Sequence, residues 1–460
     1  MKIWINKNKI QEKHDIEFNE AYEFSIKRNE YSTMYTHIDY VWRQFGVQAL
    51  NTVYEDLFII GMSVFSIDKR ISRTLFLDNW TRELEVSIPV LEIDKWKGVK
   101  EKINTMLSYL TGDIWKIEFR KTEERYMQCN SNINKKNRLN KEEYNAVSLF
   151  SGGLDSFCGA LELMEQGKSL CLIGHNEYPK LREKQEALSN AINIQYPLQK
   201  CKFISFSANS YAPVNNGEKL TKNENTSRGR SFLFLCIALT IAGIIGDGIP
   251  VYIPENGFIG LNIPLTNSRK GSCSTRTTHP YFINSFNEIL KMIGVENQII
   301  NIFAYLSKRE IVNRVKDNPI FINYARYTIS CSHPCIPRYN KDGNNEYPIN
   351  CGYCYPCLIR KSSLIDVKGM NEKYTYTKID SAFLEEFEDR NIISDTKAVL
   401  GSIYRYNNID EKELYRLIKC SGKLEKDEKE KFKKVYESTM NDLVELFSTD
   451  EEIKKYIGVK

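Results

Sequence analysis

The sequence predicts an α/β protein built on a parallel sheet, and two observations support this. Between residues 146 and 330, short apolar runs alternate with stretches of helical apolar spacing. Strands separated by helices form βαβ units, whose strands pair in parallel. The first run also ends abruptly in a glycine turn that leads into a helix-compatible segment. In order, the runs are AVSLF, SLCLIG, KFISFS, PVYIPE and IINIFA.

The length and composition indicate a globular protein of several domains. A chain of 460 residues is too long for one ordinary core. The apolar content of 42% and charged content of 27% are typical of soluble proteins, and the formal charge of +5 is too small to indicate nucleic-acid binding. We expect no signal peptide, because the first residues lack an apolar core, and the apolar run 231–245 is too short to span a bilayer. Twelve cysteines without such a signal favour the cytoplasm, with thiols free or bound to metal.

The segments before and after the predicted sheet differ in character. Residues 1–130 predict an N-terminal α+β domain, with helical spacing over 47–71 followed by three strand-like runs, RTLFLD, RELEVSIPVLEI and IWKIEFRK. Residues 131–145 are polar and basic, which suits a linker. Residues 370–460 are charged with helical spacing and predict a helical extension. The N-terminal domain contains no catalytic cluster, so we expect it to contact a protein partner.

The glycine turn at residues 151–156 predicts a phosphate-binding loop. Its residues are Ser151, Gly152, Gly153, Leu154, Asp155 and Ser156. Glycines let the backbone approach a ligand closely, and the amides at a helix N-terminus favour an anion. The two serines add hydroxyl donors, whereas a carboxylate beside a phosphate would orient the loop or share Mg²⁺. The spacing fits neither the P-loop nor the dinucleotide fingerprint.

Further candidate residues follow the other predicted strands. Ligands bind at the carboxyl ends of parallel strands. The residues at these positions are His175 with Asn176, Ser207, and Glu255 with Asn256. We therefore expect these side chains to line one site together with the phosphate loop.

Five cysteines between residues 331 and 360 predict a metal site. Cys351, Cys354 and Cys357 form C-x-x-C-x-x-C, and Cys331 and Cys335 lie upstream. A structural zinc ion takes four thiolates, with paired ligands on tight turns. An iron–sulfur cluster uses related spacings, and disulfides are disfavoured in a reducing compartment. We expect zinc in a segment spanning 331–369, with either upstream cysteine as the fourth ligand.

These two motifs together resemble a known family. SGGLDS resembles the PP-loop of ATP pyrophosphatases, and its combination with SC…CGxCxxCxxR resembles the 7-cyano-7-deazaguanine synthase (QueC) family. Ser227–Arg230 before an apolar helix, and Leu306–Ile311, match further family segments. The resemblance covers about residues 146–365 and favours Cys331 as the fourth zinc ligand. It implies that residues 146–330 form a PP-loop domain of the adenine nucleotide alpha-hydrolase (HUP) type.

The resemblance implies an ATP-dependent carbon–nitrogen ligase. Such an enzyme adenylates the carboxylate of 7-carboxy-7-deazaguanine and passes it to an amine, with ATP and Mg²⁺ as cofactors. We expect Asp155, Arg230 and Lys308 to take part in catalysis, with His279 available as an acid or base near neutral pH. His175, just past its predicted strand, is expected to contact the nucleotide. Arg230 and Lys308 would clamp phosphate or carboxylate, although each could equally be a surface cation.

One segment departs from the family pattern and leaves the product open. Residues 255–280 replace the usual SGYPDCR-type element, so the ordinary nitrile product is in doubt. Glu255, Asn256, Arg276 and Thr277 are the candidate contacts for the deazapurine. With the extra N-terminal domain, the chain looks like QueC-like proteins of antiphage defence systems (Qat and some CBASS operons). That likeness implies a homo-oligomer or a subunit of a defence complex. A tRNA-modifying PP-loop enzyme and a non-catalytic assembly subunit are the alternatives.

Overall fold

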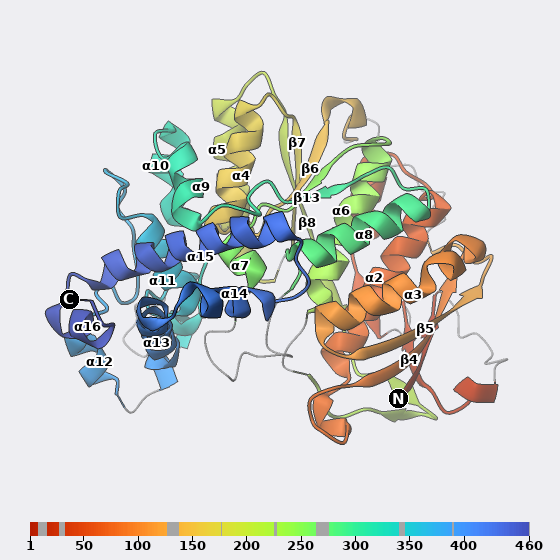
Figure 1. Ribbon diagram of the computed structural model, residues 1–460. Helices are drawn as coiled ribbons and strands as arrows, with labels where there is room; N and C mark the ends of the chain where they lie inside the picture. The colour runs from red at the N-terminus through yellow and green to blue at the C-terminus, as the bar shows by residue number, and fades with distance from the viewer. Residues whose placement is uncertain are drawn as a thin grey trace.

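The computed structural model describes nine stretches of the chain (Figure 1). They are residues 1–7, 16–26, 33–126, 138–175, 177–224, 228–263, 276–339, 346–388 and 391–459. Residues 131–137 of the predicted linker lie outside them, as do Asn176, Ser227 and residues 264–275 of the divergent segment.

The predicted parallel sheet is confirmed. It contains β6 (Ala146–Leu149), β7 (Leu170–His175), β8 (Cys201–Phe206), β12 (Val251–Tyr252) and β13 (Ile299–Ile300). All neighbours pair in parallel, in the order β13-β12-β6-β7-β8. The chain therefore winds outward in one direction from β6 to β8 and in the other from β12 to β13. Such a sheet opens a crevice where the winding reverses, here at the carboxyl ends of β6 and β12.

Helices cover both faces of this sheet, because successive strand residues point to opposite faces. Leu170 and Leu172 of β7 pack with α4 (Leu154–Glu165), α5 (Pro179–Gln195), α9 (Lys308–Val315) and α10 (Pro319–Tyr324). Cys171 and Ile173 face α6 (Gly229–Ile245) and α8 (Pro280–Met292). α6 is apolar all round, as expected of a helix buried on every side.

The N-terminal residues form a second, largely parallel sheet. Its parallel strands are β1 (Lys2–Asn6), β2 (Tyr22–Ser25), β4 (Glu83–Val90) and β5 (Ile114–Lys121). A short antiparallel hairpin, β10 (Val214–Asn215) and β11 (Glu218–Lys219), extends the sheet beside β2. Parallel strands joined through helices are an α/β arrangement, so the α+β prediction for this part was wrong.

Two local predictions in this region had different outcomes. The helical spacing over 47–71 corresponds to α2 (Thr52–Arg70), which Asn51 caps by accepting from the Val53 amide. The strand-like run RTLFLD is instead a 3-10 turn at Arg73–Leu75. Its apolar letters suggested a strand, but Ser72 caps the turn and Arg73 forms a buried ion pair with Asp113.

The N-terminal sheet and the central sheet share one hydrophobic core. α2 packs along α6, and α3 (Ile93–Thr111) packs against α8 (Figure 1). α2 and α6 approach closely because glycines face their partners: a Cβ on Gly243 would lie 2.4 Å from the Tyr54 ring, and one on Gly61 would lie 2.9 Å from the Cβ of Cys236. The core runs without a break from residue 3 to residue 299, across the predicted boundary near residue 130.

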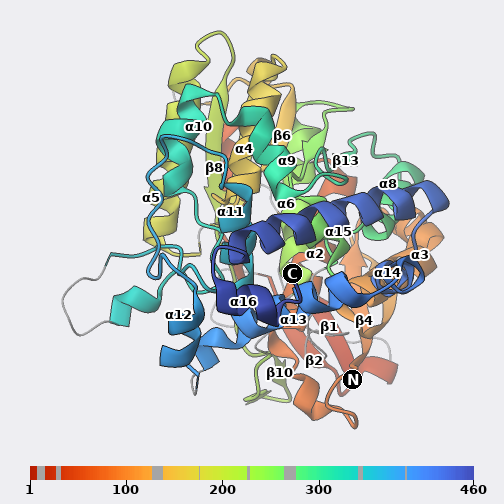
Figure 2. The ribbon, with the colours of Figure 1, turned by 60° about the vertical axis from the view of Figure 1, so that its left-hand side comes forward.

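The described residues after 370 are helical and pack on the central unit. Their helices are α12 (Ser381–Glu386), α13 (Ser394–Asn408), α14 (Glu411–Lys419), α15 (Lys426–Phe447) and α16 (Glu451–Tyr456). α15 crosses α11 (Tyr355–Ser363) and α7 (Gly257–Leu261) and shares a core with them (Figure 2). Among the described helices, none combines the length and apolar character that crossing a membrane requires. The remaining elements are β3 (Met34–Thr36), β9 (Ala208–Ser210) and α1 (Ile38–Gln44).

Candidate functional site

The predicted phosphate loop lies where the winding of the sheet reverses. β6 ends at Leu149, and α4 begins at Leu154 after a turn in which Gly152 has a φ of +81°. This left-handed conformation favours glycine, and a Cβ there would lie 2.9 Å from the side chain of Gln185. Gln185 donates to the carbonyls of Phe150 (3.1 Å) and Ser151 (3.0 Å), so α5 holds the loop from outside.

The loop presents hydroxyls and helix amides on one side. The Ser151 and Ser156 hydroxyls are 3.2 Å apart, and the Gly153 amide donates to the Ser151 Oγ at 3.2 Å. Gly153 is the N-cap of α4 and provides no side-chain cap. Amides in the first turn of a helix have no partner within the helix and favour an anion. This arrangement suits phosphate.

Asp155 links three segments that are far apart in sequence. Its two carboxylate oxygens accept separately from Lys308 Nζ at 2.5 Å and from Asn256 Nδ2 at 2.6 Å. Lys308 begins α9 and is 6% exposed, so the ion pair is largely shielded from water. Asn256 also caps α7 and is fully buried. Asp155 and Lys308 therefore stabilise the loop. Asn256, which was predicted to contact the deazapurine, instead holds the Asp155 carboxylate.

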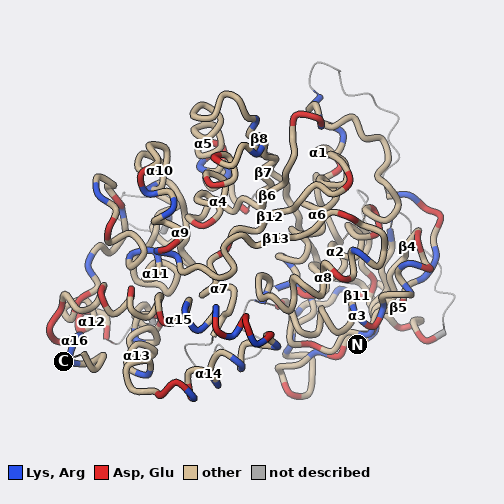
Figure 3. The backbone as a smooth tube through the Cα atoms, turned by 45° about the horizontal axis from the view of Figure 1, so that its top comes forward, with Lys and Arg blue, Asp and Glu red and all other residues tan. Residues whose placement is uncertain are grey.

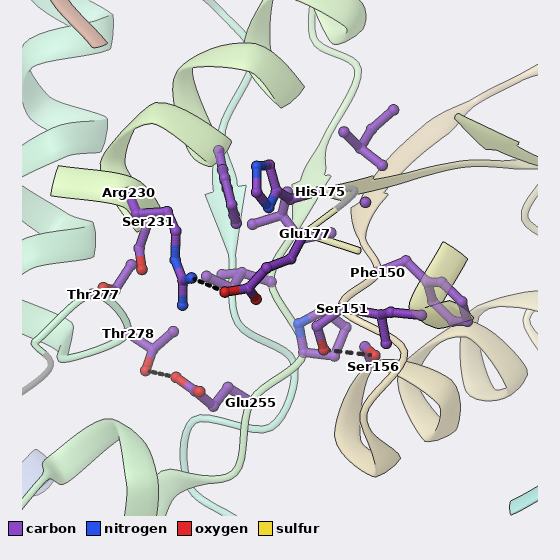
Figure 4. Close-up of a pocket in the computed structure, with 17 residues that line it drawn as sticks. Phe150, Ser151, Ser156, His175, Glu177, Arg230, Ser231, Glu255, Thr277 and Thr278 are labelled. Atoms are coloured by element: carbon purple, nitrogen blue, oxygen red, sulfur yellow. Dashed lines mark hydrogen bonds and ion pairs between the residues drawn. The ribbon is translucent and has the colours of Figure 1, made fainter. Parts of the chain in front are cut away.

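A cavity of about 360 Å³ opens beside the loop (Figure 4). One wall carries Ser151 and Ser156, and the other carries Glu255, Thr277 and Thr278. The cavity is also lined by apolar residues, among them Phe150, Ile173, Phe234 and Ile253. A mostly apolar hollow with a few converging polar groups is typical of a small-molecule site.

Among the described residues that line this cavity, Arg230 is the permanent cation. It stands on the first turn of α6 and meets Glu177 at 3.4 Å across the mouth, where both side chains are about half exposed. His175, at the end of β7, stacks on Phe234 with ring centroids 5.0 Å apart. Burial, together with nearby Arg230, lowers the pKa of His175 to about 4. The His175 side chain is therefore uncharged near pH 7, and its ring forms part of the cavity wall.

Glu255 is the second carboxylate that lines the cavity, besides Glu177. It follows β12, and its side chain accepts a hydrogen bond from the Thr278 hydroxyl. Burial raises the pKa of Glu255 to about 7, and the nearby charge of Asp155 acts in the same direction. A carboxyl group with this pKa can either accept or donate a proton near neutral pH.

Of three predicted residues in this region, His279 and Arg276 have structural surroundings, whereas Thr277 lines the cavity. His279 is fully buried, caps α8 by accepting from the Tyr281 amide, and meets the Ser421 hydroxyl at 3.3 Å. Burial, with Arg276 nearby, lowers its pKa to about 3, so it is a neutral cap away from the cavity. Arg276 donates to the Tyr109 carbonyl at 2.9 Å and lies over that ring. Thr277 lines the cavity, but its hydroxyl is enclosed and finds no partner in the described part of the chain.

Four cysteines form a cluster that could hold a metal ion such as zinc. The sulfurs of Cys331, Cys351, Cys354 and Cys357 all lie within 4.8 Å of one another. The pairs Cys331–Cys354 and Cys351–Cys357 are 3.8 and 3.9 Å apart. Ligands about 2.3 Å from a tetrahedral zinc ion are roughly 3.8 Å from each other, so the spacing fits. The thiols are free, which excludes disulfides here, and Cys335 lies outside the cluster.

Backbone amides and a glycine turn support the cluster. The amides of His333 and Cys351 donate to the Cys331 sulfur at 3.2 and 3.3 Å, as donors around a thiolate ligand do. Gly352 has a φ of +95°, and a Cβ there would lie 2.0 Å from the Tyr376 carbonyl oxygen. The tight C-x-x-C turn therefore requires glycine.

The cysteine segment is joined to the phosphate loop through residues 328–330. The Ile329 amide donates to the Gly152 carbonyl at 2.8 Å, and the Leu154 amide donates to the Ser330 hydroxyl at 3.4 Å. Arg360, fully buried on α11 just after the last cysteine ligand, donates to that hydroxyl at 3.3 Å. Asn350, which precedes the first cysteine of the triplet, accepts from the Ser330 amide. The cluster thus anchors the segment that covers the loop.

No protein-family model and no curated protein matches the chain. The site therefore rests on its own geometry. The residues that sequence reasoning missed are Glu177, Gln185 and Phe234. Only Glu177 had a signal, because it lies just past a predicted strand, whereas Gln185 and Phe234 look like ordinary helix residues.

Proposed function

We propose that this protein is an ATP-dependent ligase of the QueC type. It adenylates the carboxylate of 7-carboxy-7-deazaguanine and transfers the acyl group to an amine, in antiphage defence. The observation that carries the proposal is the glycine turn at the carboxyl end of β6, which opens onto a cavity with Arg230 at its mouth. PP-loop enzymes place ATP at such a turn.

ATP would bind with its phosphates on the loop. The first-turn amides of α4 and the hydroxyls of Ser151 and Ser156 suit the phosphates, and Arg230 can reach them by leaving the weak contact with Glu177. The adenine ring fits against His175 and Phe234. Mg²⁺, bound with ATP, would neutralise phosphate charge. The four cysteines would hold Zn²⁺ as a structural ion, because a closed set of four thiolates leaves no open position.

The proposed reaction has two steps. A substrate carboxylate oxygen attacks the α-phosphorus, the bond to the β-phosphate bridging oxygen breaks, and pyrophosphate leaves. The amine then attacks the acyl carbon, the acyl–oxygen bond breaks, and AMP leaves with an amide as product. Ammonia, or an amine on a partner protein or nucleic acid, can serve as the nucleophile.

In the proposed second step, Glu255 would accept the protons that the amine loses. An ammonium ion must lose a proton before it attacks, and the resulting amide nitrogen loses another. Glu255 lies in the cavity opposite Ser151 and Ser156, with one oxygen held by Thr278. With a pKa of about 7, it is ionised often enough to accept a proton and basic enough to keep it. Glu255 replaces His279 as the acid–base candidate.

The test is product analysis with purified protein. The protein would be incubated with ATP, Mg²⁺, the carboxy base and ammonium, and AMP, pyrophosphate and the modified base would be measured. We expect AMP and pyrophosphate in equal amounts, together with an amide. Arg230→Ala should reduce the rate, whereas Arg182→Ala, an exposed arginine on nearby α5, should not. No AMP above background would overturn the proposal, and AMP formed only with tRNA would favour the tRNA-modifying alternative.

A further inference from the structure

A second cavity, far from the phosphate loop in sequence, lies between α14 and α15. Its volume is about 620 Å³, and it is open to solvent. The two helices run side by side on the surface, with α15 packed inward on α7 and α11 (Figures 1 and 2). The lining residues are mostly charged: Glu411, Lys412, Tyr415, Arg416, Lys419, Lys426, Lys429 and Glu430. We call this cavity the basic groove.

In the described part of the chain, the cations of the basic groove are not paired with carboxylates or other side chains. Within the described ranges, the structure contains no ion pair or side-chain hydrogen bond from Lys412, Arg416, Lys419, Lys426 or Lys429. The two acids are already engaged: Glu411 pairs with Lys433, and Glu430 accepts from the Tyr415 hydroxyl. Five unpaired cations in one hollow repel one another, and this repulsion would be relieved by an anionic ligand.

The cations are arranged as a stripe along α14. Lys412, Arg416 and Lys419 recur at four and then three residues, so they share one helix face. The opposite face buries Leu414 and Ile418. At 1.5 Å a residue, the stripe spans about 10 Å, and Lys426 and Lys429 face it from the first turn of α15. The ligand must therefore carry several negative charges over such a length.

The lining favours phosphates over an acidic protein. Protein interfaces are centred on apolar and aromatic anchors and are depleted of charge at the core. The basic groove has one aromatic residue, Tyr415, whose hydroxyl is already bonded to Glu430. Lys and Arg without apolar anchors are the usual contacts to a nucleic-acid backbone. The formal charge of +5 does not reveal the groove, because acidic residues offset its cations, among them Glu413, Asp427 and Glu428 on the same two helices (Figure 3).

We propose that the basic groove binds the phosphate backbone of a nucleic acid, without reading its sequence. The turn after α14 is anchored to the buried helix cap His279: the Ser421 carbonyl accepts from the Tyr109 hydroxyl at 3.1 Å, and the Ser421 side chain contacts His279. His279 lies two residues from Thr277 of the cavity wall. Binding of nucleic acid in the groove requires neither ATP nor the deazapurine, so it can be tested independently of the proposed ligase activity.

The test measures binding of a labelled single-stranded RNA of about 20 nucleotides to the full-length protein by fluorescence anisotropy, without ATP. The change is the triple variant Lys412→Ala/Arg416→Ala/Lys419→Ala. Each backbone contact on a single strand contributes about 0.7 to the slope of log affinity against log salt, so the triple variant should lose about 2 from that slope. We expect affinity at low salt to fall by roughly tenfold or more.

The matched control removes the same charge elsewhere. Lys95, Lys97 and Lys291 are exposed on α3 and α8, and their triple replacement by Ala should leave the slope unchanged. Circular dichroism would check that both variants fold. The proposal is overturned if the wild-type protein shows no salt-dependent RNA binding, if both triple variants lose it equally, or if an acidic peptide binds the groove in preference to RNA.

Discussion

The buried carboxyl group of Glu255 should make stability depend on pH in a way that Glu255→Gln removes. The pKa is about 7 in the folded protein, against an ordinary value of 4.5. Between these values the folded state binds a proton that the unfolded state releases, so its stabilising contribution is complete below about pH 4.5 and is lost as the pH rises through about 7. At about 1.4 kcal/mol for each tenfold change in proton affinity, the loss amounts to about 3 kcal/mol.

Urea unfolding at about pH 5 and about pH 8 measures this difference directly. Glutamine keeps the size of the side chain and can still accept from Thr278, but it does not ionise. The free energy of unfolding of Glu255→Gln, minus that of the wild type, should be larger by about 2.5 kcal/mol at the higher pH, because part of the contribution is already lost at about pH 5. Other titrating groups cancel in that subtraction.

The control is Glu177→Gln, at the mouth of the same cavity. Its side chain is 57% exposed, so water already stabilises its charge. The free energy of unfolding of Glu177→Gln, minus that of the wild type, should therefore be nearly the same at both pH values. An equal effect of Glu255→Gln at both pH values would refute the reasoning, because Glu255 would then titrate alike in the folded and unfolded states.

Three further predictions concern the neighbouring groups. Thr277→Val should raise the free energy of urea unfolding by about 1 kcal/mol, because it removes an enclosed hydroxyl without a partner, whereas Thr278→Val should lower it by a similar amount. Arg230→Ala should weaken ATP binding roughly 10- to 100-fold by calorimetry, since a charged hydrogen bond contributes about 1.5–3 kcal/mol, and an unchanged affinity would remove Arg230 from the nucleotide site. Cys354→Ser should abolish stoichiometric zinc in elemental analysis and weaken ATP binding, whereas Cys335→Ser should change neither.

Patterns of contiguous residues predicted the parts of the fold that depend on local sequence. The alternation of apolar runs with helical spacing predicted the central parallel sheet, and the C-x-x-C-x-x-C spacing predicted the cysteine cluster. Each apolar run and the cysteine triplet are local signals, whose residues lie within a few positions of one another. The α+β prediction for the N-terminal part failed because strand direction depends on how distant segments pair, which apolar spacing does not encode.

The roles of the polar residues were harder to predict, because a residue type does not reveal its partners. His279 has the chemistry of a catalyst, but a hydrogen bond to the Tyr281 amide and complete burial make it a helix cap. Asn256 follows a strand as a ligand contact would, yet its amide is used by Asp155. Glu255 gains its properties from burial and from Thr278, which lies 23 positions away. These are properties of the folded environment rather than of the motif.

The link between the cysteine cluster and the phosphate loop explains why two motifs about 180 residues apart belong to one site. The Gly152 carbonyl and the Leu154 amide are hydrogen-bonded to residues 329 and 330, so that segment helps to hold the shape of the turn. Arg360 and Asn350 hold the segment; Asn350 directly precedes Cys351, and Arg360 lies three residues after Cys357. A metal that fixes the cysteines therefore also fixes the amides that would face phosphate. On the proposed function, zinc in the cluster would contribute to nucleotide binding by holding these amides in position, without contacting the nucleotide.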